Sequence, residues 1–403
     1  MLEFLSMGKT GVYIQVPFCQ TKCTYCNFHT GVVSAGRFAP YAEAVCREIR
    51  EHRRLLESVG VSLPLELAGQ SGVVDTVYVG GGTPSLLESR LLGKMLAALR
   101  ETFACVFEEV TLEADPETVD AEKAAAWAAM GFGRISFGTQ SFVDEELKAA
   151  GRMHRREDIY RAVPILRAAG ILNISFDLIA GLPKQTEESW RQSLAEAVAL
   201  GPEHISIYMM EIDEASRLGL EVLQGGVRYS ARELPSEEAM AEFYEVAQEQ
   251  LQAAGYGQYE ISNWARPGFE SRHNRKYWLR EPYLGIGAGA HSFSGKQRWA
   301  NRHDAAAYVA AIAEGMSAVE TVDTVTREMA LEEEFFLGLR QLEGIEIGRI
   351  EREYGMSFSE RIAKLAAAGM VEWDEERLRL PAGKLSVSNE VIVELLRAVD
   401  VGA

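Results

Sequence analysis

Pro17-Phe18-Cys19-Gln20-Thr21-Lys22-Cys23-Thr24-Tyr25-Cys26-Asn27-Phe28 is the stretch that decides the fold of this chain. It directly follows the apolar run at residues 12–16 and holds three of the five cysteines. Thiolates at the first, fifth and eighth positions of a short loop can bind three irons of a cubane cluster and leave the fourth iron without a protein ligand. We therefore expect Cys19, Cys23 and Cys26 to ligate one 4Fe-4S cluster.

An iron without a protein ligand can bind a small chelating molecule. The amino and carboxylate groups of S-adenosylmethionine (SAM) suit this role, because they bring the sulfonium close enough for an electron from the cluster to cleave it. Zinc is a weaker alternative, since structural zinc sites use four ligands in paired short spacings and only His29 offers a nearby fourth ligand. A disulfide framework is weaker still with 5 cysteines in 403 residues, and we interpret Cys46 and Cys105 as residues without chemistry.

The composition indicates a large protein with an acidic surface. The chain has 403 residues, 47% of them hydrophobic, which is enough for two or three domains. A formal net charge of -18, from 41 basic and 59 acidic residues, argues against nucleic acid as a partner. No apolar run is long enough to span a bilayer, and the mixed residues 1–10 predict no signal peptide. We expect a cytoplasmic protein, and peripheral contact with a membrane stays open.

Strand and helix patterns alternate after the cysteine stretch. Such alternation predicts a parallel sheet or barrel with right-handed crossovers and with ligands at the carboxyl ends of its strands. The expected strands are residues 12–16, 75–79, 109–113, 134–137, 173–179 and 204–209. The expected helices are residues 41–56, 86–103 (with Ser85 as its cap), 121–130, 156–169 and 187–200.

Polar residues recur just after these strands. The glycines at residues 80–82 allow a ligand to approach the backbone closely. Glu113 and Asp177 can accept hydrogen bonds from an ammonium group or from ribose hydroxyls, Gln140 can donate or accept, and Arg152 can bind a carboxylate through two hydrogen bonds. Together they predict a site for a nucleoside and an amino acid.

These motifs carry a family resemblance. The Cys-x3-Cys-x2-Cys loop with Tyr25 is followed by the segments at residues 80–84, 113–116, 138–141, 151–154 and 177–183, and the set resembles the radical SAM family of oxygen-independent coproporphyrinogen III oxidases. The resemblance implies an α/β fold, a partial (β/α)6 TIM-type barrel that holds the cluster on the three cysteines. It also implies that SAM contacts Tyr13, Tyr25, Gly81, Gly82, Thr83, Glu113, Gln140, Arg152 and Asp177.

Two features point to one branch of this family. The decarboxylating oxidases have a further cysteine where this chain has Phe28, and they have a longer segment before the loop. The chain also has the His-Asn-x-x-Tyr-Trp signature of the related heme chaperones, the HemW-like branch, at residues 273–278. The resemblance therefore implies a heme chaperone that transfers heme to an acceptor such as a respiratory-chain hemoprotein, with an electron donor for the cluster. The alternative is a coproporphyrinogen III oxidase or dehydrogenase, or another radical SAM enzyme that modifies porphyrin or heme, so enzymatic activity stays open.

The same signature supplies the predicted heme-binding residues. They are His273, Asn274, Tyr277 and Trp278, in which an imidazole beside large aromatic rings combines iron ligation with flat apolar contact. A packed histidine at a domain boundary is the alternative interpretation of His273. His291 and His303 are weaker candidates for heme contact, and His52 and His204 are interpreted as structural.

The C-terminal part has a different pattern. Helices around Phe335 and at residues 346–354, 360–368 and 389–398, with a hairpin at residues 370–380, predict a small α+β, winged-helix-like domain. Residues 321–403 carry 10 basic and 17 acidic residues, so we expect this domain to pack on the barrel or a partner protein and not on DNA. The predicted division is a core barrel at residues 1–215, a connecting region with the heme motif at residues 216–320 and the C-terminal domain at residues 321–403.

Overall fold

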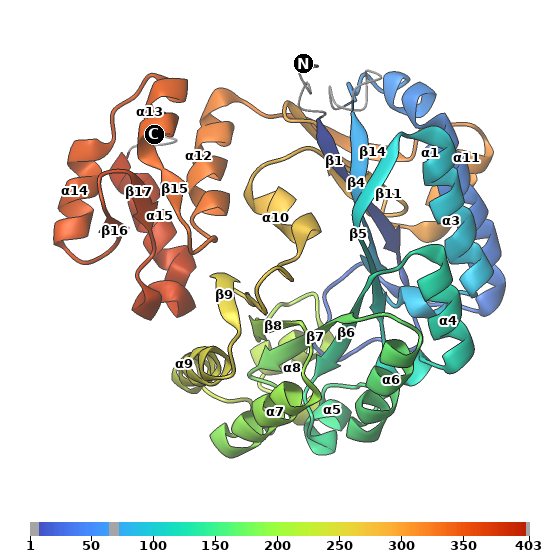
Figure 1. Cartoon of the computed structure of the whole chain (residues 1–403), viewed down its shortest axis with the longest axis horizontal. Coiled ribbons are helices and arrows are strands. Elements are labelled where there is room, and N and C mark those ends of the chain that lie inside the picture. The colour runs from blue at the N-terminus through green and yellow to red at the C-terminus, as the bar shows by residue number, and fades with distance from the viewer. Residues whose placement is uncertain (1–7, 64–71, 400–403) are drawn as a thin grey trace.

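A twelve-stranded sheet organises the protein, with parallel strands in its middle and antiparallel strands at both edges (Figure 1). The computed structural model describes residues 8–63 and 72–399. We expected no signal peptide in residues 1–10. Residues 1–7 of that segment lie outside the described residues.

The six predicted strands are neighbours in the middle of this sheet, and all pair in parallel. Their central side chains, such as Val12, Leu112 and Phe176, are fully buried, as expected for strands covered on both faces. The predicted α/β fold with a partial barrel is therefore confirmed. The strands are β1 (Lys9–Val16), β4 (Val73–Gly81), β5 (Cys105–Ala114), β6 (Arg134–Gln140), β7 (Asn173–Ala180) and β8 (His204–Met209).

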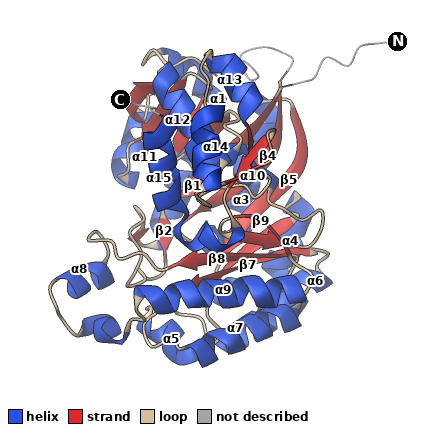
Figure 2. Ribbon diagram, turned by 90° about the vertical axis from the view of Figure 1, so that its left-hand side faces the viewer, coloured by secondary structure: helices blue, strands red, loops and turns tan. Residues whose placement is uncertain are grey.

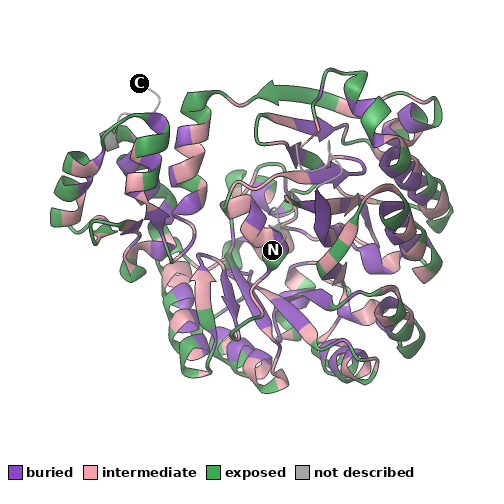
Figure 3. Ribbon diagram, turned by 45° about the horizontal axis from the view of Figure 1, so that its top comes forward, coloured by how far each residue is buried: buried purple, intermediate pink, exposed green. Residues whose placement is uncertain are grey.

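Helices cover the outer face of this curved sheet, with buried residues toward the strands and exposed residues toward solvent (Figure 3). Asp120 and Thr186 cap two of them, and Gly131 and Gly201, both with positive φ, end the same two helices. Among the described residues, none of the helices combines the length and apolar character that a membrane crossing requires. The outer helices are α1 (Phe38–Glu57), α3 (Ser89–Thr102), α4 (Ala121–Met130), α5 (Asp144–Ala149), α6 (Arg156–Ala168) and α7 (Glu187–Leu200).

One predicted helix boundary is wrong. A short 3-10 turn, Pro84–Leu86, comes before α3, and the extended Leu87 separates it from the helix that starts at Ser89. The Ser85 side chain does not cap a helix. It is fully buried, and its hydroxyl accepts hydrogen bonds from the Asp115 backbone N–H at 3.2 Å and from the Thr118 hydroxyl at 2.7 Å. Ser85 therefore joins the loop after β4 to the loop after β5.

Residues 216–320 extend the sheet at both edges. β10 and β9 continue it antiparallel beyond β8, whereas β11 pairs in parallel with β1 and is followed by three antiparallel strands. The domain boundaries at 215 and 320 stay a prediction. The elements are α8 (Arg217–Leu223), α9 (Glu237–Ala253), β9 (Gly257–Glu260), β10 (Asn263–Ala265), α10 (Arg272–Trp278), β11 (Tyr283–Ile286), β12 (His291–Phe293), β13 (Gln297–Asn301), α11 (Ala305–Ala313) and β14 (Val319–Thr324).

The C-terminal unit is a three-stranded sheet with helices around it, beside the barrel in Figure 1. It packs against the barrel, as one of the two expectations had it: Arg280 forms ion pairs with Glu333 and Glu334, and the backbone N–H of Ile261 donates to the Arg340 carbonyl at 3.0 Å. Its elements are α12 (Arg327–Gly338), β15 (Ile345–Glu346), α13 (Ile347–Tyr354), α14 (Ser359–Ala367), β16 (Glu372–Trp373), β17 (Arg377–Arg379) and α15 (Ser388–Val399).

A buried tyrosine joins three elements at the end of β1. The Tyr41 hydroxyl on α1 donates to the Gln15 carbonyl at 2.8 Å and accepts from the Ala288 backbone N–H, also at 2.8 Å. Tyr41 is only 1% exposed, so no water can replace these bonds without a rearrangement.

We expect Tyr41→Phe to destabilise the fold by about 1–3 kcal/mol, because it leaves a buried carbonyl and a buried N–H without their partner. The matched control is Tyr160→Phe, which removes a hydroxyl from a half-exposed tyrosine and should change the free energy of unfolding by no more than about 0.5 kcal/mol. Urea unfolding of the two variants measures the difference. Equal free energies of unfolding for Tyr41→Phe and Tyr160→Phe would show that the Tyr41 hydroxyl does not hold the three elements together.

Candidate functional site

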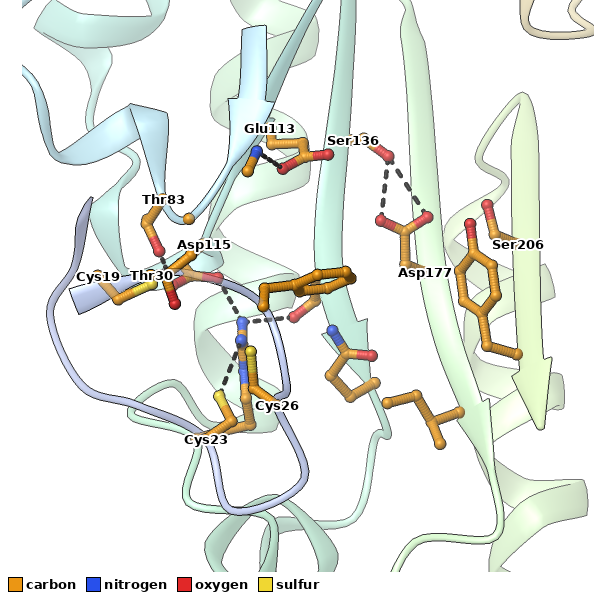
Figure 4. Close-up of a pocket in the computed structure, with 18 of the residues that line it drawn as sticks. Cys19, Cys23, Cys26, Thr30, Thr83, Glu113, Asp115, Ser136, Asp177 and Ser206 are labelled. Carbon is orange, nitrogen blue, oxygen red and sulfur yellow. Dashed lines mark hydrogen bonds and ion pairs between the residues drawn. The ribbon is translucent and has the colours of Figure 1, made fainter. Parts of the chain in front are cut away.

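A cavity of about 450 Å³ opens at the carboxyl ends of the parallel strands (Figure 4). Loops that follow β1, β4, β5, β6 and β8 form its wall, which is the arrangement expected for a ligand site in this kind of fold. The cavity brings together most of the predicted site residues: Cys19, Cys23, Tyr25, Cys26, Gly81, Gly82, Thr83, Glu113, Gln140, Arg152, Asp177 and Asn274.

The cysteine loop is closed at its base by two short strands. β2 (Phe18–Cys19) pairs with β3 (Gly31–Val32), so the residues between them form a compact turn over the cavity. The end of α5 also fixes the loop, since the Thr24 backbone N–H donates to the Ala150 carbonyl at 3.0 Å. All three loop cysteines are partly exposed free thiols.

The loop has the donor set that an iron-sulfur cluster needs. Burial raises the pKa of the Cys19 and Cys26 thiols, so their thiolate forms need a cation beside them. The buried Thr30 hydroxyl acts in the opposite direction, because a hydrogen bond from it lowers the pKa of both thiols (Figure 4 labels the three residues). Within the same residues, no three His, Cys, Asp or Glu side chains are grouped closely enough to hold a single metal ion. If an iron-sulfur cluster is bound, Cys19, Cys23 and Cys26 would hold it.

The glycine loop after β4 lies directly against the cysteine loop. The Gly82 N–H donates to the Val16 carbonyl at 2.8 Å, and the Thr83 N–H donates to the Phe18 carbonyl at 2.7 Å. A Cβ atom on Gly82 would lie 2.5 Å from the Phe18 carbonyl oxygen, which leaves no room for any larger residue. The neighbouring Gly81 has a φ of +113°, a conformation that L side chains rarely adopt.

Arg152 connects the strand-end loops beneath the cysteines. Its guanidinium forms an ion pair with Asp115 and donates to the Gly138 carbonyl at 2.7 Å and to the Cys23 sulfur at 3.5 Å. Asp115 also accepts from the Thr83 hydroxyl at 3.1 Å. Burial lowers the pKa of Arg152, but Asp115, Tyr25 and Cys23 together outweigh it and the net shift is upward, so the guanidinium stays charged beside the cysteines.

Two acidic side chains face the cavity from β5 and β7. Glu113 accepts a hydrogen bond from the Gly81 N–H at 2.9 Å, and burial raises the pKa of its carboxyl to about 7. Asp177 accepts from the Ser136 hydroxyl at 3.2 Å, and burial raises its pKa too. Gln140 ends β6 with a φ of 63° after an irregularity in the strand pairing. These groups can accept hydrogen bonds from a polar ligand inside the cavity.

Four of the predicted site residues do not line the cavity: Tyr13, His273, Tyr277 and Trp278. Both ring nitrogens of His273 are hydrogen-bonded, Nδ1 to the Thr76 hydroxyl and Nε2 to the Tyr277 hydroxyl, each at 2.9 Å. His273 is 1% exposed, and its neighbour Asn274 is the residue of this helix that reaches the cavity together with its cap, Ser271. In this conformation His273 therefore offers no free nitrogen to an iron.

Several cavity residues were missed by the sequence analysis. The small polar residues Ser136, Ser175 and Ser206 lie within β6, β7 and β8, and each lines the cavity. Ser136 pairs with Ser175, and Ser206 pairs with Asp177. Polar residues inside otherwise apolar strands were the available signal for them. His204, interpreted as structural, also lines the cavity, while its ring nitrogens bond the Ser175 and Tyr259 hydroxyls at 2.8 Å.

Comparisons with known proteins agree with this fold and site. The radical SAM superfamily model matches residues 13–197 and the HemN C-terminal domain model matches residues 325–382, so the barrel and its cysteine loop are those of a radical SAM protein. The heme chaperone HemW of Bacillus subtilis (strain 168) is 34% identical over 94% of this chain and 97% of its own length. That of Escherichia coli (strain K12) is 34% identical over 70% of this chain and 69% of its own length. The chain belongs to the HemW family.

A solved structure shows the same fold. The coproporphyrinogen III oxidase HemN from Escherichia coli superposes with a TM-score of 0.79 over 98% of this chain and 91% of its own, at 23% sequence identity. At that identity the likeness establishes the architecture alone.

The contact between Gly82 and Phe18 generates a prediction. Gly82→Ala should destabilise the protein by about 1–3 kcal/mol, because the new methyl group must push the backbone of the cysteine loop away from β4. Gly31→Ala is the matched control in the same loop region, since a Cβ there meets no atom within 4 Å. Denaturant unfolding compares the two, and a Gly82→Ala variant as stable as Gly31→Ala would contradict the close approach.

Proposed function

We propose that this protein is a heme chaperone, which binds heme and transfers it to an acceptor hemoprotein such as a respiratory enzyme. The observation that carries the proposal is the similarity over nearly the whole chain to the heme chaperone HemW of Bacillus subtilis (strain 168). The site supports it, since one cavity collects the three thiols, the glycine loop and the buried acids. The acceptor and the electron donor are proposed partners, and the cytoplasm is the proposed compartment because reduced thiols persist there.

The cavity would hold the proposed cofactors: Cys19, Cys23 and Cys26 would ligate a 4Fe-4S cluster, and SAM would bind at its remaining iron. When bound, this pair supplies one-electron chemistry. The charged Arg152 guanidinium offsets the negative charge of the thiolates, and its bonds to Asp115 and Gly138 make it a positioning residue. The glycine loop lets the ligand approach the backbone.

The remaining predicted SAM contacts divide by their place in the structure. Tyr25, Thr83, Gln140 and Asp177 lie in the cavity wall, where they can bond or pack against the nucleoside and amino acid. Tyr13 stacks behind them on Tyr78, with ring centroids 5.8 Å apart, and supports the wall. Heme contact with the helix of Asn274, Tyr277 and Trp278 also stays part of the proposal, although iron ligation by His273 would first require the loss of one of its two hydrogen bonds.

The cluster assignment predicts that the cysteines fall into two groups. Replacing Cys19, Cys23 and Cys26 together by alanine should abolish iron binding after anaerobic reconstitution. The matched control replaces Cys46 and Cys105, neither of which lines the cavity, and should retain about four irons per chain, the content of one cubane. Iron analysis and electron paramagnetic resonance, with and without SAM, measure this. Retention of four irons by the first variant would refute the assignment.

The raised pKa of the Glu113 carboxyl predicts that SAM binding depends on pH. Its carboxyl has a pKa of about 7 in the free protein because burial disfavours the charge. A cationic ligand binds the carboxylate form of Glu113 more tightly than the protonated form, so binding below pH 7 releases a proton from Glu113. The affinity for SAM should therefore increase by up to about tenfold for each unit by which the pH is raised toward 7, and it should level off above pH 7. Titrations at pH 5.5–8.5 should show this rise in the wild type and a flatter profile in Glu113→Gln. Since titration of SAM itself is common to both proteins, identical profiles would exclude Glu113.

The proposed function is tested by a direct comparison of two outcomes. The reconstituted protein loaded with heme should convert an apo-hemoprotein to its holo form, with no consumption of the porphyrin. The same protein given coproporphyrinogen III, reductant and SAM should form no protoporphyrinogen beyond a single equivalent. Repeated turnover to protoporphyrinogen would replace the chaperone with the enzyme, the alternative that the family resemblance left open.

A further inference from the structure

The seven histidines of this chain fall into two groups. Four of them are buried, and each has at least one ring nitrogen in a hydrogen bond within the protein: His52, His154, His204 and His273. The other three, His29, His291 and His303, are exposed. None of these three imidazoles takes part in a hydrogen bond among the described residues, so their nitrogens are available to an external ligand.

The three exposed histidines also lie together, although they come from separate segments. The ring of His29, three residues after Cys26, stacks on the ring of His303 with centroids 3.9 Å apart and planes inclined by 30°. His291 begins β12 and pairs with Ala300 on β13, just before His303. Burial and then the neighbouring His303 lower the pKa of both His29 and His291, which favours the neutral imidazole that can bind a metal.

Exposed apolar side chains flank His29 in the sequence. Phe28 is 66% exposed, Val32 is 60% exposed and Val33 is 38% exposed, all within four residues of His29. Lys22 lies on the same loop, with its ammonium 3.4 Å from the Phe28 carbonyl. Exposed apolar side chains that gather beside unused imidazoles and a cation suit a flat apolar ligand that carries a metal and an anionic edge.

We propose that the heme iron is ligated by an imidazole of the stacked pair His29 and His303, on a surface that we call the histidine patch (Phe28, His29, Val32, Val33, His291 and His303). This inference rests on the proposed function. Heme supplies the four in-plane nitrogens itself, so one imidazole from the protein is sufficient.

The patch has properties that a carrier needs and that the helix of His273 lacks. Its imidazoles are exposed, so heme can arrive and leave without unfolding of the chain around it. His273, in contrast, would have to leave Thr76 or Tyr277 and emerge from a buried position. In the histidine patch the second imidazole of the stacked pair lies beside the first and can take over the iron or pack on the porphyrin edge.

The test compares two sets of glutamine substitutions in the reconstituted full-length protein. Titration with heme should show about tenfold or greater loss of affinity, and a changed Soret band, in His29→Gln/His303→Gln. Cluster iron and SAM binding should stay at wild-type values, because neither side chain lines the cavity. His291→Gln should have a smaller effect in the same direction. Added imidazole should restore the wild-type Soret position in the double variant, which a merely unfolded patch would not show.

The matched control is His273→Gln, which should leave the Soret band of bound heme unchanged. Loss of the band in His273→Gln, together with its retention in the double variant, would overturn the histidine patch in favour of the buried imidazole. Unchanged affinity and spectrum in the double variant would overturn it as well. Both results leave the proposed function intact, whereas failure of the wild-type protein to bind heme at all would refute the chaperone itself.

Discussion

The buried ion pair between Arg152 and Asp115 is the interaction on which the site depends. It joins the loop after α5 to the loop after β5, and its further bonds to the Gly138 carbonyl, the Thr83 hydroxyl and the Cys23 sulfur bring in three more segments. A guanidinium with this many partners costs less to bury than a free one, because four hydrogen bonds satisfy most of its donors. The loops therefore share one charged centre, and the cysteine loop is fixed relative to the strand ends.

The position of that centre follows from the sheet. Parallel strands place their carboxyl ends on one side, so the loops after β1, β4, β5, β6 and β8 meet although they lie far apart in sequence. The close contact of Gly82 with Phe18 then sets how near the cysteine and glycine loops lie, and the outer helices in Figure 2 hold the strands from outside. Cavity shape is thus a consequence of strand order and of two glycine conformations.

The sequence predicted the parts of this arrangement that are local. The cysteine spacing, the apolar strands and the polar residues at strand ends are all visible within a few residues, and they identified the barrel and most of the cavity wall. Interactions between distant segments were not visible. The burial of His273 depends on Thr76, 197 residues away, and the stacking of His29 on His303 depends on strand pairings at the far edge of the sheet. Ser85 was misinterpreted for the same reason, because its partners lie after the next strand.

The account separates two iron sites, one inside the cavity and one on the surface, and a single measurement addresses that separation. Anomalous diffraction at the iron edge from crystals of the reconstituted protein with SAM and heme would locate every iron. The account predicts one four-iron centre against Cys19, Cys23 and Cys26, with SAM in contact with it, and a separate fifth iron outside the cavity. Heme iron within the cavity, or a centre of fewer irons bound by other residues, would contradict it.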